Sequence, residues 1–273
     1  MTGTAVAELS PAARAFDAVA GSFDDRFGTW LSVAAQRRAV RAVLADCFPV
    51  GSRLIEVGGG TGEDALWLME RGRDVLLTDP APEMVRIARS KLGDCTGGIA
   101  KVAAAEEIGE LAGARFDGAY SNFAALNCIG DLRPFAAGLA RLLHVGAPAI
   151  LVLFGTFCPG EMIVETVRGR PRNTLRRMAR GDVPARLGGH DFTVRYHRAA
   201  DLQRAMAPWF EPRGRQGVGL FVPPSAAEPW ISRHPKLLAA FERLDRALPP
   251  ALALFGDHIL YRFVRTDVAA DAA

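Results

Sequence analysis

The stretch Leu54-Ile-Glu-Val-Gly-Gly-Gly-Thr-Gly-Glu-Asp64 decides the fold of this chain. Four residues of a buried strand run into a glycine-rich turn, and a helix follows the turn. Such a turn brings a ligand against bare backbone at the N-terminus of a helix. The stretch therefore predicts a βα unit with a ligand site at its turn.

Short apolar runs alternate with segments of helical periodicity from Leu54 onward, a pattern typical of successive βα units and a mostly parallel sheet. The first five strands are expected at Leu54–Val57, Val75–Thr78, Ile99–Val102, Phe116–Ser121 and Ala149–Phe154. Beyond Phe157 the pattern changes to helices or loops over Cys158–Leu187, Ala199–Trp209 and Pro223–Pro250. Three further strands are expected at Phe192–His197, Val218–Val222 and His258–Val264.

The composition is that of a folded globular protein and excludes a disordered or collagen-like chain, with 49% hydrophobic and 23% charged residues in 273. The longest apolar stretch, Ala147–Phe157, is too short to cross a bilayer, and no basic region precedes an apolar one at the N-terminus. The four cysteines form no C-x-x-C motif, and the net charge is only +3. We therefore expect a cytoplasmic protein with no metal site, no membrane contact and no general affinity for nucleic acid.

Two classes of ligand compete for the glycine-rich turn. A dinucleotide turn has the spacing G-x-G-x-x-G, but counting from Gly58 places Glu63 at the third glycine, where a carboxylate repels a pyrophosphate. Counting from Gly60 satisfies G-x-G-x-x-A through Ala65, yet that turn begins three residues after the strand. Glu56 at the strand end favours a ligand with an ammonium or sulfonium group, and S-adenosylmethionine (SAM) carries both.

Asp79 ends the second apolar run, where a carboxylate can accept hydrogen bonds from both hydroxyls of a ribose. A structural turn and a helix cap are the alternative interpretations of the glycines and of Asp79. With these two motifs in this order, the chain resembles the class I SAM-dependent methyltransferases over about Phe16–Phe154. The resemblance implies an α/β fold with a Rossmann-like, seven-stranded, mostly parallel sheet, an antiparallel last strand, and helical cap insertions after the fifth and sixth strands.

The same resemblance implies a cofactor site that is spread over several segments. Met84 flanks the adenine, and Asn122 lies beside the methionine part of the cofactor. Ala104 stands where the family commonly has an aspartate, so the Ala105 backbone and Glu106 are expected to contact the adenine amino group instead. The implied cofactor-binding residues are Phe23, Glu56, Gly58, Gly60, Gly62, Asp79, Pro80, Met84, Ala105, Glu106, Asn122 and Phe123.

The N-terminal segment Phe16–Phe23 resembles the family's lid over the cofactor, although an ordinary amphipathic helix explains it equally well. We predict a helical lid over residues 1–48 and a SAM-binding core over 49–156. A cap insertion is predicted over 157–190, and the remainder of the core sheet over 191–266 with a second cap insertion at 223–250. Residues 267–273 are predicted to be a disordered tail.

Six arginines gather between Arg168 and Arg180. They suggest an RNA-binding face, but no aromatic residues for base stacking alternate with them, so a solvated helix face is favoured. The predicted function is therefore SAM-dependent methylation of a bulky small molecule at a hydroxyl or amine, by a monomer or homodimer without nucleic acid. An RNA methyltransferase that uses Arg168–Arg180 and a non-catalytic SAM-binding subunit are the alternatives.

His258 is the candidate general base. In the sheet that the chain resembles, the antiparallel last strand begins at the carboxyl edge of the parallel strands, where ligands bind. A histidine that titrates near neutrality can take a proton from a hydroxyl as it attacks the methyl group. The alternative is that His258 only hydrogen-bonds to nearby backbone and that Asp257 caps the turn. Other titratable candidates, each more often structural than catalytic, are Glu161, His190, Tyr196 and His197.

Overall fold

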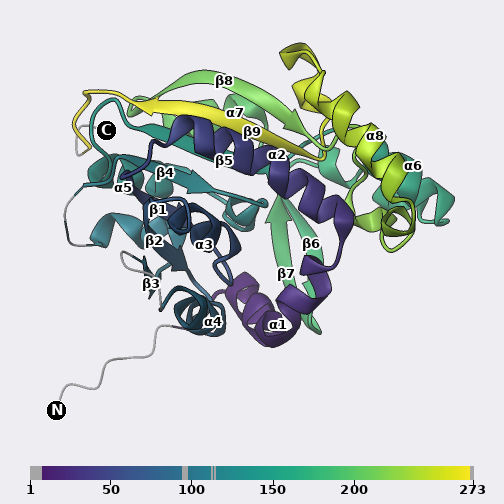
Figure 1. The fold of residues 1–273 in the computed structure, drawn as a ribbon, viewed down its shortest axis with the longest axis horizontal. Helices are drawn as coiled ribbons and strands as arrows, with labels where there is room; N and C mark the ends of the chain where they lie inside the picture. The colour runs from purple at the N-terminus through teal and green to yellow at the C-terminus, as the bar shows by residue number, and fades with distance from the viewer. Residues whose placement is uncertain (1–7, 94–97, 112, 114, 271–273) are drawn as a thin grey trace.

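The computed structural model describes residues 8–93, 98–111, 113 and 115–270, and its centre is a seven-stranded sheet (Figure 1). The strands lie in the order β3-β2-β1-β4-β5-β9-β8. Their bounds are β1 Arg53–Val57, β2 Asp74–Asp79, β3 Gly98–Val102, β4 Gly118–Ser121, β5 Pro148–Phe154, β8 Phe210–Val218 and β9 His258–Arg265. Strands β1 to β5 are parallel, whereas β9 runs antiparallel to both β5 and β8. The predicted Rossmann-like sheet with an antiparallel last strand is confirmed.

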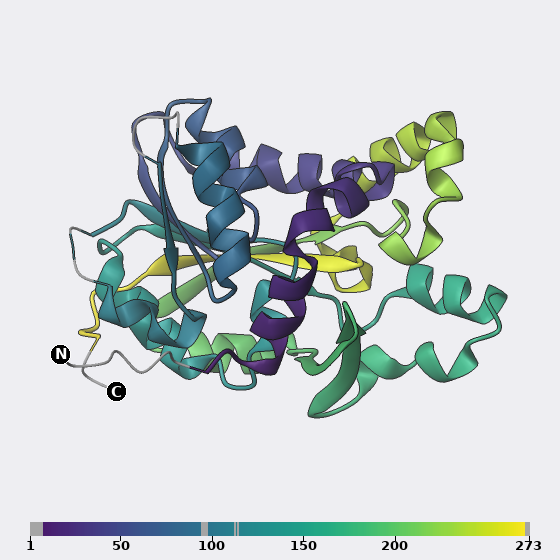
Figure 2. The same cartoon turned by 90° about the horizontal axis from the view of Figure 1, so that it is seen from below.

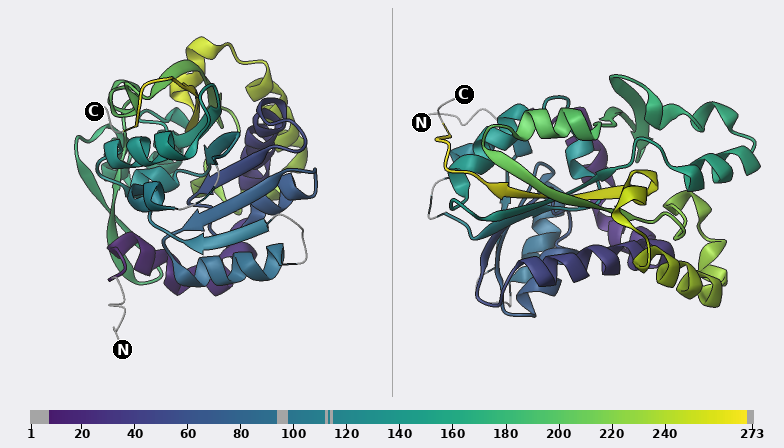
Figure 3. Two further views of the ribbon diagram at one scale, coloured as in Figure 1. Left: turned by 90° about the vertical axis from the view of Figure 1, so that its left-hand side faces the viewer. Right: turned by 90° about the horizontal axis from the view of Figure 1, so that it is seen from above.

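Helices cover both faces of the sheet (Figure 3). Successive strand residues point to opposite faces, so Leu54 packs against one helical layer and Ile55 against the other. The first layer contains α2 (Leu31–Cys47), α3 (Glu63–Met69) and α4 (Pro82–Leu92). The second layer contains α5 (Arg133–Leu142) and α7 (Ala199–Met206). None of the described helices is long and apolar enough to span a membrane.

Two insertions leave the sheet at its carboxyl edge, as predicted after the fifth and sixth strands, and lie at the same end of the molecule (Figure 2). The first contains α6 Pro159–Val167, the 3₁₀ helices η3 Pro171–Asn173 and η4 Arg176–Met178, and a hairpin of β6 Asp182–Leu187 and β7 His190–Arg195. The second contains η5 Ser225–Ala227, η6 Ile231–Arg233, α8 Pro235–Arg246 and η7 Pro250–Phe255. The first insertion is therefore not purely helical.

Two strand predictions are wrong in position. The strand expected at Val218–Val222 is β8, which ends at Val218. Its residues are mostly exposed and include a bulge between Pro212 and Gly214, because an edge strand needs neither apolar alternation nor every ladder hydrogen bond. Phe192–His197, expected in the core sheet, instead overlaps β7, which pairs with β6 in a separate two-stranded sheet. The predicted boundary at 190/191 therefore cuts through a hairpin.

The ends of the chain bear on two further predictions. The helical N-terminus contains α1 (Pro11–Gly28), whose first turn is capped by the Ser10 hydroxyl, and then α2. Residues 1–7 of the predicted lid lie outside the described residues. The tail expected to be disordered from 267 onward is packed as far as Ala270, since Trp209 Nε1 donates a hydrogen bond to the Ala269 carbonyl (3.2 Å). Residues 271–273 lie outside the described residues.

Candidate functional site

The turn between β1 and α3 is held in a shape that requires glycine. Gly58, Gly60 and Gly62 all have positive φ, at 70°, 54° and 85°. A Cβ on Gly58 would clash with the side chain of Ala125, and one on Gly59 would lie 2.8 Å from the Glu56 carboxyl carbon. The loop therefore runs directly over Glu56 and keeps its backbone free for a ligand.

Asp79, the last residue of β2, fixes this loop in place. Its carboxylate accepts hydrogen bonds from the backbone N–H groups of Gly60 and Ala81, both at 2.9 Å. Burial outweighs these bonds and raises the pKa of Asp79 to about 6. Each carboxylate oxygen has a second lone pair, so Asp79 can accept ribose hydroxyls without releasing the loop.

Four buried side-chain atoms lack a hydrogen-bond partner among the described residues, and all lie near the carboxyl ends of β1 and β4 or at the start of β9: Glu56 Oε2, Tyr120 Oη, Ser121 Oγ and His258 Nδ1. Burial, together with the charges of Asp64 and Asp79, raises the pKa of Glu56 well above its usual range. Nearly all buried polar groups in native proteins are paired. Glu56 and Tyr120 are close enough to shift each other's pKa, and the four groups gather at one edge of the sheet, where a polar ligand can supply further partners.

The turn after β4 connects the start of α3 to the start of β9 through the side chains of Asn122 and Phe123. Phe123 and Ala124 both have positive φ, at 48° and 62°, a strained conformation for residues with a Cβ. Asn122 stabilises the turn, since its amide donates to Asp64 Oδ2 (2.8 Å) and its carbonyl accepts from the Phe123 N–H (2.8 Å). The Phe123 ring is thereby placed edge-on to the His258 ring, with 5.7 Å between centroids.

His258 is buried at the start of β9, only 5% exposed. Its ring stacks on Phe154 at 4.8 Å, and its Nδ1 lies 3.4 Å from Asp257 Oδ2 without forming an aligned hydrogen bond. The Asp257 carboxylate accepts hydrogen bonds from Gln36 Nε2 (3.1 Å) and from Arg177 (2.6 Å). The interpretation of Asp257 as a turn cap is wrong, because residues far away in sequence occupy its carboxylate.

Arg177 connects the first insertion to this edge. Its guanidinium is buried and pairs with both Asp257 and Glu161, and it also donates to the Asp257 carbonyl (2.7 Å). Burial alone would raise the pKa of Asp257, but the charges of His258 and Arg177 hold it well below its usual range. The arginine cluster is therefore not one solvated helix face: α6 ends at Val167, and Arg177 turns inward. The exposed members are Arg168, Arg170, Arg172, Arg176 and Arg180.

Helix α1 lies across the cofactor side of the site, between α4 and β7 (Figure 1). The Asp24 carboxylate accepts a hydrogen bond from Thr61 of the glycine-rich turn (2.6 Å) and pairs with Lys91 (2.6 Å). Phe23 packs in a small apolar cluster with Met84. These contacts are consistent with a lid and give the helix specific partners beyond its amphipathic pattern.

The remaining predicted residues are distributed unevenly around the edge. Glu106 is exposed in η1 (Ala105–Glu110). Burial raises the pKa of Cys128 to about 12, and the charges of Asp79 and then Glu106 add to the rise, so these groups lie near one another. His190 is exposed on the hairpin, whereas His197 is buried with its Nε2 2.9 Å from the Ile129 carbonyl. Neither histidine forms part of the cluster around His258.

Sequence reasoning overlooked two charged residues beside the glycine-rich turn. Arg41 Nε donates to Asp64 Oδ1 at 2.6 Å, and the Arg37 guanidinium lies 4.9 Å from the Phe123 ring centroid. Arg37 and Arg41 are one turn apart on α2, and this i, i+4 spacing was the available signal. Their approach to the turn depends on how α2 packs across the sheet, which the local sequence does not reveal.

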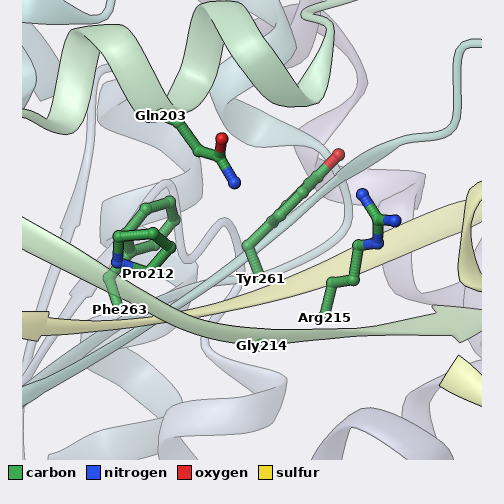
Figure 4. A pocket seen from close by; sticks show the side chains of 6 residues that line it. All are labelled: Gln203, Pro212, Gly214, Arg215, Tyr261 and Phe263. Atoms are coloured by element: carbon green, nitrogen blue, oxygen red, sulfur yellow. The ribbon is translucent and has the colours of Figure 1, made fainter.

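A surface pocket of about 170 Å³ lies elsewhere, between α7 and strands β8 and β9 (Figure 4). Figure 4 shows the polar ends of Gln203, Tyr261 and Arg215 on the same side of the strands. Its lining residues are Gln203, Pro212, Gly214, Arg215, Tyr261 and Phe263. None of them belongs to the group of unpaired atoms at the carboxyl edge, so this pocket is separate from the candidate site.

Residues 55–151 match the family model described as a methyltransferase domain. The chain carries a class I SAM-dependent methyltransferase domain. This stretch contains the glycine-rich turn, Asp79 and the turn after β4, so the enzyme's cofactor is SAM. No curated protein matches the chain in sequence.

Solved structures share the fold of this methyltransferase at low sequence identity. A SAM-dependent methyltransferase from Listeria monocytogenes is 15% identical with a TM-score of 0.58, covering 86% of this chain and 98% of its own. One from Mesorhizobium loti is 21% identical with a TM-score of 0.55, covering 85% and 98%. The geranyl diphosphate C-methyltransferase of Streptomyces coelicolor, solved with Mg²⁺, geranyl diphosphate and S-adenosyl-L-homocysteine, is 14% identical with a TM-score of 0.51, covering 84% and 79%.

Proposed function

We propose that this enzyme transfers the methyl group of SAM to a hydroxyl or amine of a small, partly apolar molecule, with His258 as the general base. The observation that carries the proposal is the position of His258. Its ring contacts Phe123, which follows directly on Asn122, and its Nδ1 lies beside the Asp257 carboxylate, so Nε2 is the nitrogen that would take the proton. A titratable group beside the methionine end of the cofactor is well placed to receive the acceptor's proton.

The residues at the edge fit the chemistry of SAM. The orphaned Glu56 carboxylate suits the ammonium group, and Asp79 suits the ribose diol. Met84 Sδ lies 4.0 Å from where a Cβ of Gly60 would stand, so this side chain borders the open face of the loop. We assign cofactor binding to Phe23, Glu56, Gly58, Gly60, Gly62, Asp79, Pro80, Met84, Ala105, Glu106, Asn122 and Phe123. When bound, SAM supplies an electrophilic methyl group on a cationic sulfur.

The proposed reaction needs one proton acceptor when the nucleophile is a hydroxyl. SAM, when bound, would give up its methyl group to the acceptor oxygen and keep the electron pair of the carbon–sulfur bond, so the one atom that this chain has to accept is the hydroxyl proton. The hydroxyl proton passes to the His258 imidazole. The resulting imidazolium lies beside the Asp257 carboxylate, 3.4 Å away at Nδ1, and this charge stabilises it. Phe123 and Phe154 flank the ring and keep water from it.

Three further observations favour a small molecule as the acceptor. The insertions present apolar side chains, with Ile163 65%, Trp230 54% and Phe221 41% exposed, and these suit a bulky apolar body. A structural neighbour was solved with geranyl diphosphate, a small molecule with an apolar chain. The overall charge of +3 adds little attraction for RNA.

The test begins with SAM that carries a labelled methyl group, incubated with the enzyme and either a small-molecule extract or cellular RNA. We expect label in the small-molecule fraction and none in RNA. With the acceptor identified, His258→Ala should lower kcat by about 10²- to 10⁴-fold and leave the affinity for S-adenosylhomocysteine unchanged. His190→Ala, an exposed histidine of the same chain, is the matched control.

Both the labelling experiment and the His258→Ala measurement have outcomes that would contradict the proposal. Label in RNA would contradict a small-molecule acceptor and favour the RNA methyltransferase alternative. Absence of transfer to both, with intact cofactor binding, would favour a SAM-binding subunit without turnover. Normal turnover by a folded His258→Ala enzyme would remove His258 from the mechanism and leave alignment of the substrates as the source of catalysis.

A further inference from the structure

We propose that the pocket between α7 and strands β8 and β9 is a second ligand site, which takes a carboxylate carried on a small apolar ring. The pocket lies outside the candidate active site, so the inference goes beyond the proposed methyl transfer and does not depend on it. Gln203, Arg215 and Tyr261 offer hydrogen-bond donors there, and no acidic residue of the described chain lines the pocket.

The pairing of β8 with β9 places the lining side chains on one face of the sheet. Arg215 stands directly opposite Tyr261, and Pro212 stands opposite Phe263. Arg215 and Pro212 are three residues apart and would point to opposite faces of a regular strand. The bulge between Pro212 and Gly214 adds one residue to β8, so both pairs fall on the face that α7 covers.

Tyr261 is the buried polar group of this pocket. The residue is only 4% exposed, and its hydroxyl has no hydrogen-bond partner among the described residues. The hydroxyl is not one of the four unpartnered atoms that are closed off from solvent, so it opens into the pocket that Tyr261 lines. Burial raises the pKa of Tyr261 to about 12, although the charge of Arg215 opposes the rise. The hydroxyl is therefore protonated at neutral pH and can donate to an anion.

Arg215 supplies the positive charge of the pocket. Acids on the two flanking elements are engaged elsewhere, since Glu211 pairs with Arg213 (2.8 Å) and Asp201 pairs with Arg204 (3.0 Å). Arg215 itself forms no ion pair with any described residue. An unpaired guanidinium beside a phenol and an amide matches a planar acceptor with two oxygens, and a carboxylate is such an acceptor.

The size and the apolar end of the pocket define the rest of the ligand. Its volume of about 170 Å³ is close to that of a cavity of about 150 Å³ that holds a benzene ring. Figure 4 shows the rings of Pro212 and Phe263 together on one side of the polar ends of Tyr261 and Arg215. A six-membered ring with one carboxylate, as in benzoate, satisfies both ends.

This pocket and the candidate active site lie on opposite faces of β9. His258 and Tyr261 are three residues apart on that strand, so their side chains point away from each other. A ligand bound beside Tyr261 therefore leaves the surroundings of His258 free. We expect the pocket and the cofactor site to be filled at the same time.

A fluorine NMR titration of the intact enzyme with 4-fluorobenzoate tests the inference. The dissociation constant should be on the order of 1 mM, as expected for one charged contact and one ring in a partly open pocket, and should be unchanged by S-adenosylhomocysteine. The neutral 4-fluorobenzamide should bind about tenfold more weakly, because it loses the charge of the carboxylate.

Three variants locate the bound carboxylate. Arg215→Gln should weaken 4-fluorobenzoate binding by about tenfold, the lower end of the range for charged hydrogen bonds because Arg215 is exposed. Tyr261→Phe, which keeps the ring and removes the hydroxyl, should weaken it by about 3- to 10-fold. Arg213→Gln is the matched control, since Arg213 lies on the same strand outside the pocket, and it should leave the affinity unchanged.

Four results would overturn the inference. Unchanged affinity in Arg215→Gln would place the bound carboxylate elsewhere on the enzyme. An equal loss in Arg213→Gln would show attraction to surface charge without a defined site. Equal binding of the amide and the carboxylate would show an apolar cavity that does not recognise an anion. Absence of binding at about 10 mM, ten times the expected dissociation constant, would show that the pocket takes no such ligand.

Discussion

The proposed cofactor half of the site, from Leu54 to Phe123, and the proposed acceptor half, the cluster around Asp257 and His258, are built by different means. From Leu54 to Phe123 the site consists largely of backbone: positive-φ glycines, two N–H groups that donate to Asp79, and the Phe123 N–H that donates to Asn122. The acceptor half depends on side chains that converge from distant segments. Gln36 and Arg177 come from α2 and the first insertion, and they meet at the buried carboxylate of Asp257, directly before β9.

This difference explains how the two halves tolerate change. A backbone cradle needs particular residues only where a Cβ would clash, so its pattern can be recognised locally in the sequence. A buried ionic cluster is stable only while every charge keeps its partner, so the loss of one member exposes the others. We therefore expect substitutions in the acceptor half to act mainly on stability and those in the cofactor half mainly on ligand affinity.

The largest expected effect follows from Arg177→Met. This change leaves Asp257 and Glu161 buried without their shared cation, and it should lower the free energy of unfolding by about 3 to 5 kcal/mol. Urea denaturation measures the loss. Arg172→Met, an exposed member of the same arginine cluster, is the control and should stay within about 0.5 kcal/mol of wild type. Equal stability of the two variants would contradict the distinction between the halves.

A smaller effect should appear in the pH dependence of cofactor binding. Because burial raises the pKa of Asp79 to about 6, its carboxylate gains a proton as the pH falls through 6 and loses acceptor capacity for the ribose. Affinity for S-adenosylhomocysteine should therefore rise between pH 5 and pH 7, by up to about tenfold per pH unit below 6.

Asp79→Asn separates this effect from the titration of Glu56, which the variant retains. The variant should bind more weakly than wild type at pH 7 and show a flatter profile between pH 5 and pH 7. Parallel profiles for the two proteins, measured by calorimetry in matched buffers, would assign the dependence to another group.

Sequence patterns predicted the parts of the molecule whose conformation depends on residues close together in the chain. The glycine-rich turn, the ends of β1 and β2 and the amphipathic helices follow from periodicity and backbone geometry, and all of them are present. Strand β8 was misplaced because its edge position removes the apolar alternation. The positions of Arg37 and Arg177 depend on contacts with distant elements. The i, i+4 spacing of Arg37 and Arg41 indicates a shared helix face, but it does not indicate what that face contacts.

The most direct test of the central claim is calorimetry of S-adenosylhomocysteine and NADH on the wild-type enzyme and on Asp79→Ala. We predict that the wild-type enzyme binds S-adenosylhomocysteine and not NADH, because Glu63 follows the turn where a pyrophosphate would lie. Loss of the Asp79 carboxylate should weaken S-adenosylhomocysteine binding by about 1.5 to 3 kcal/mol, the scale of charge-assisted hydrogen bonds. Unchanged affinity in Asp79→Ala, or tight binding of NADH by the wild-type enzyme, would contradict the account.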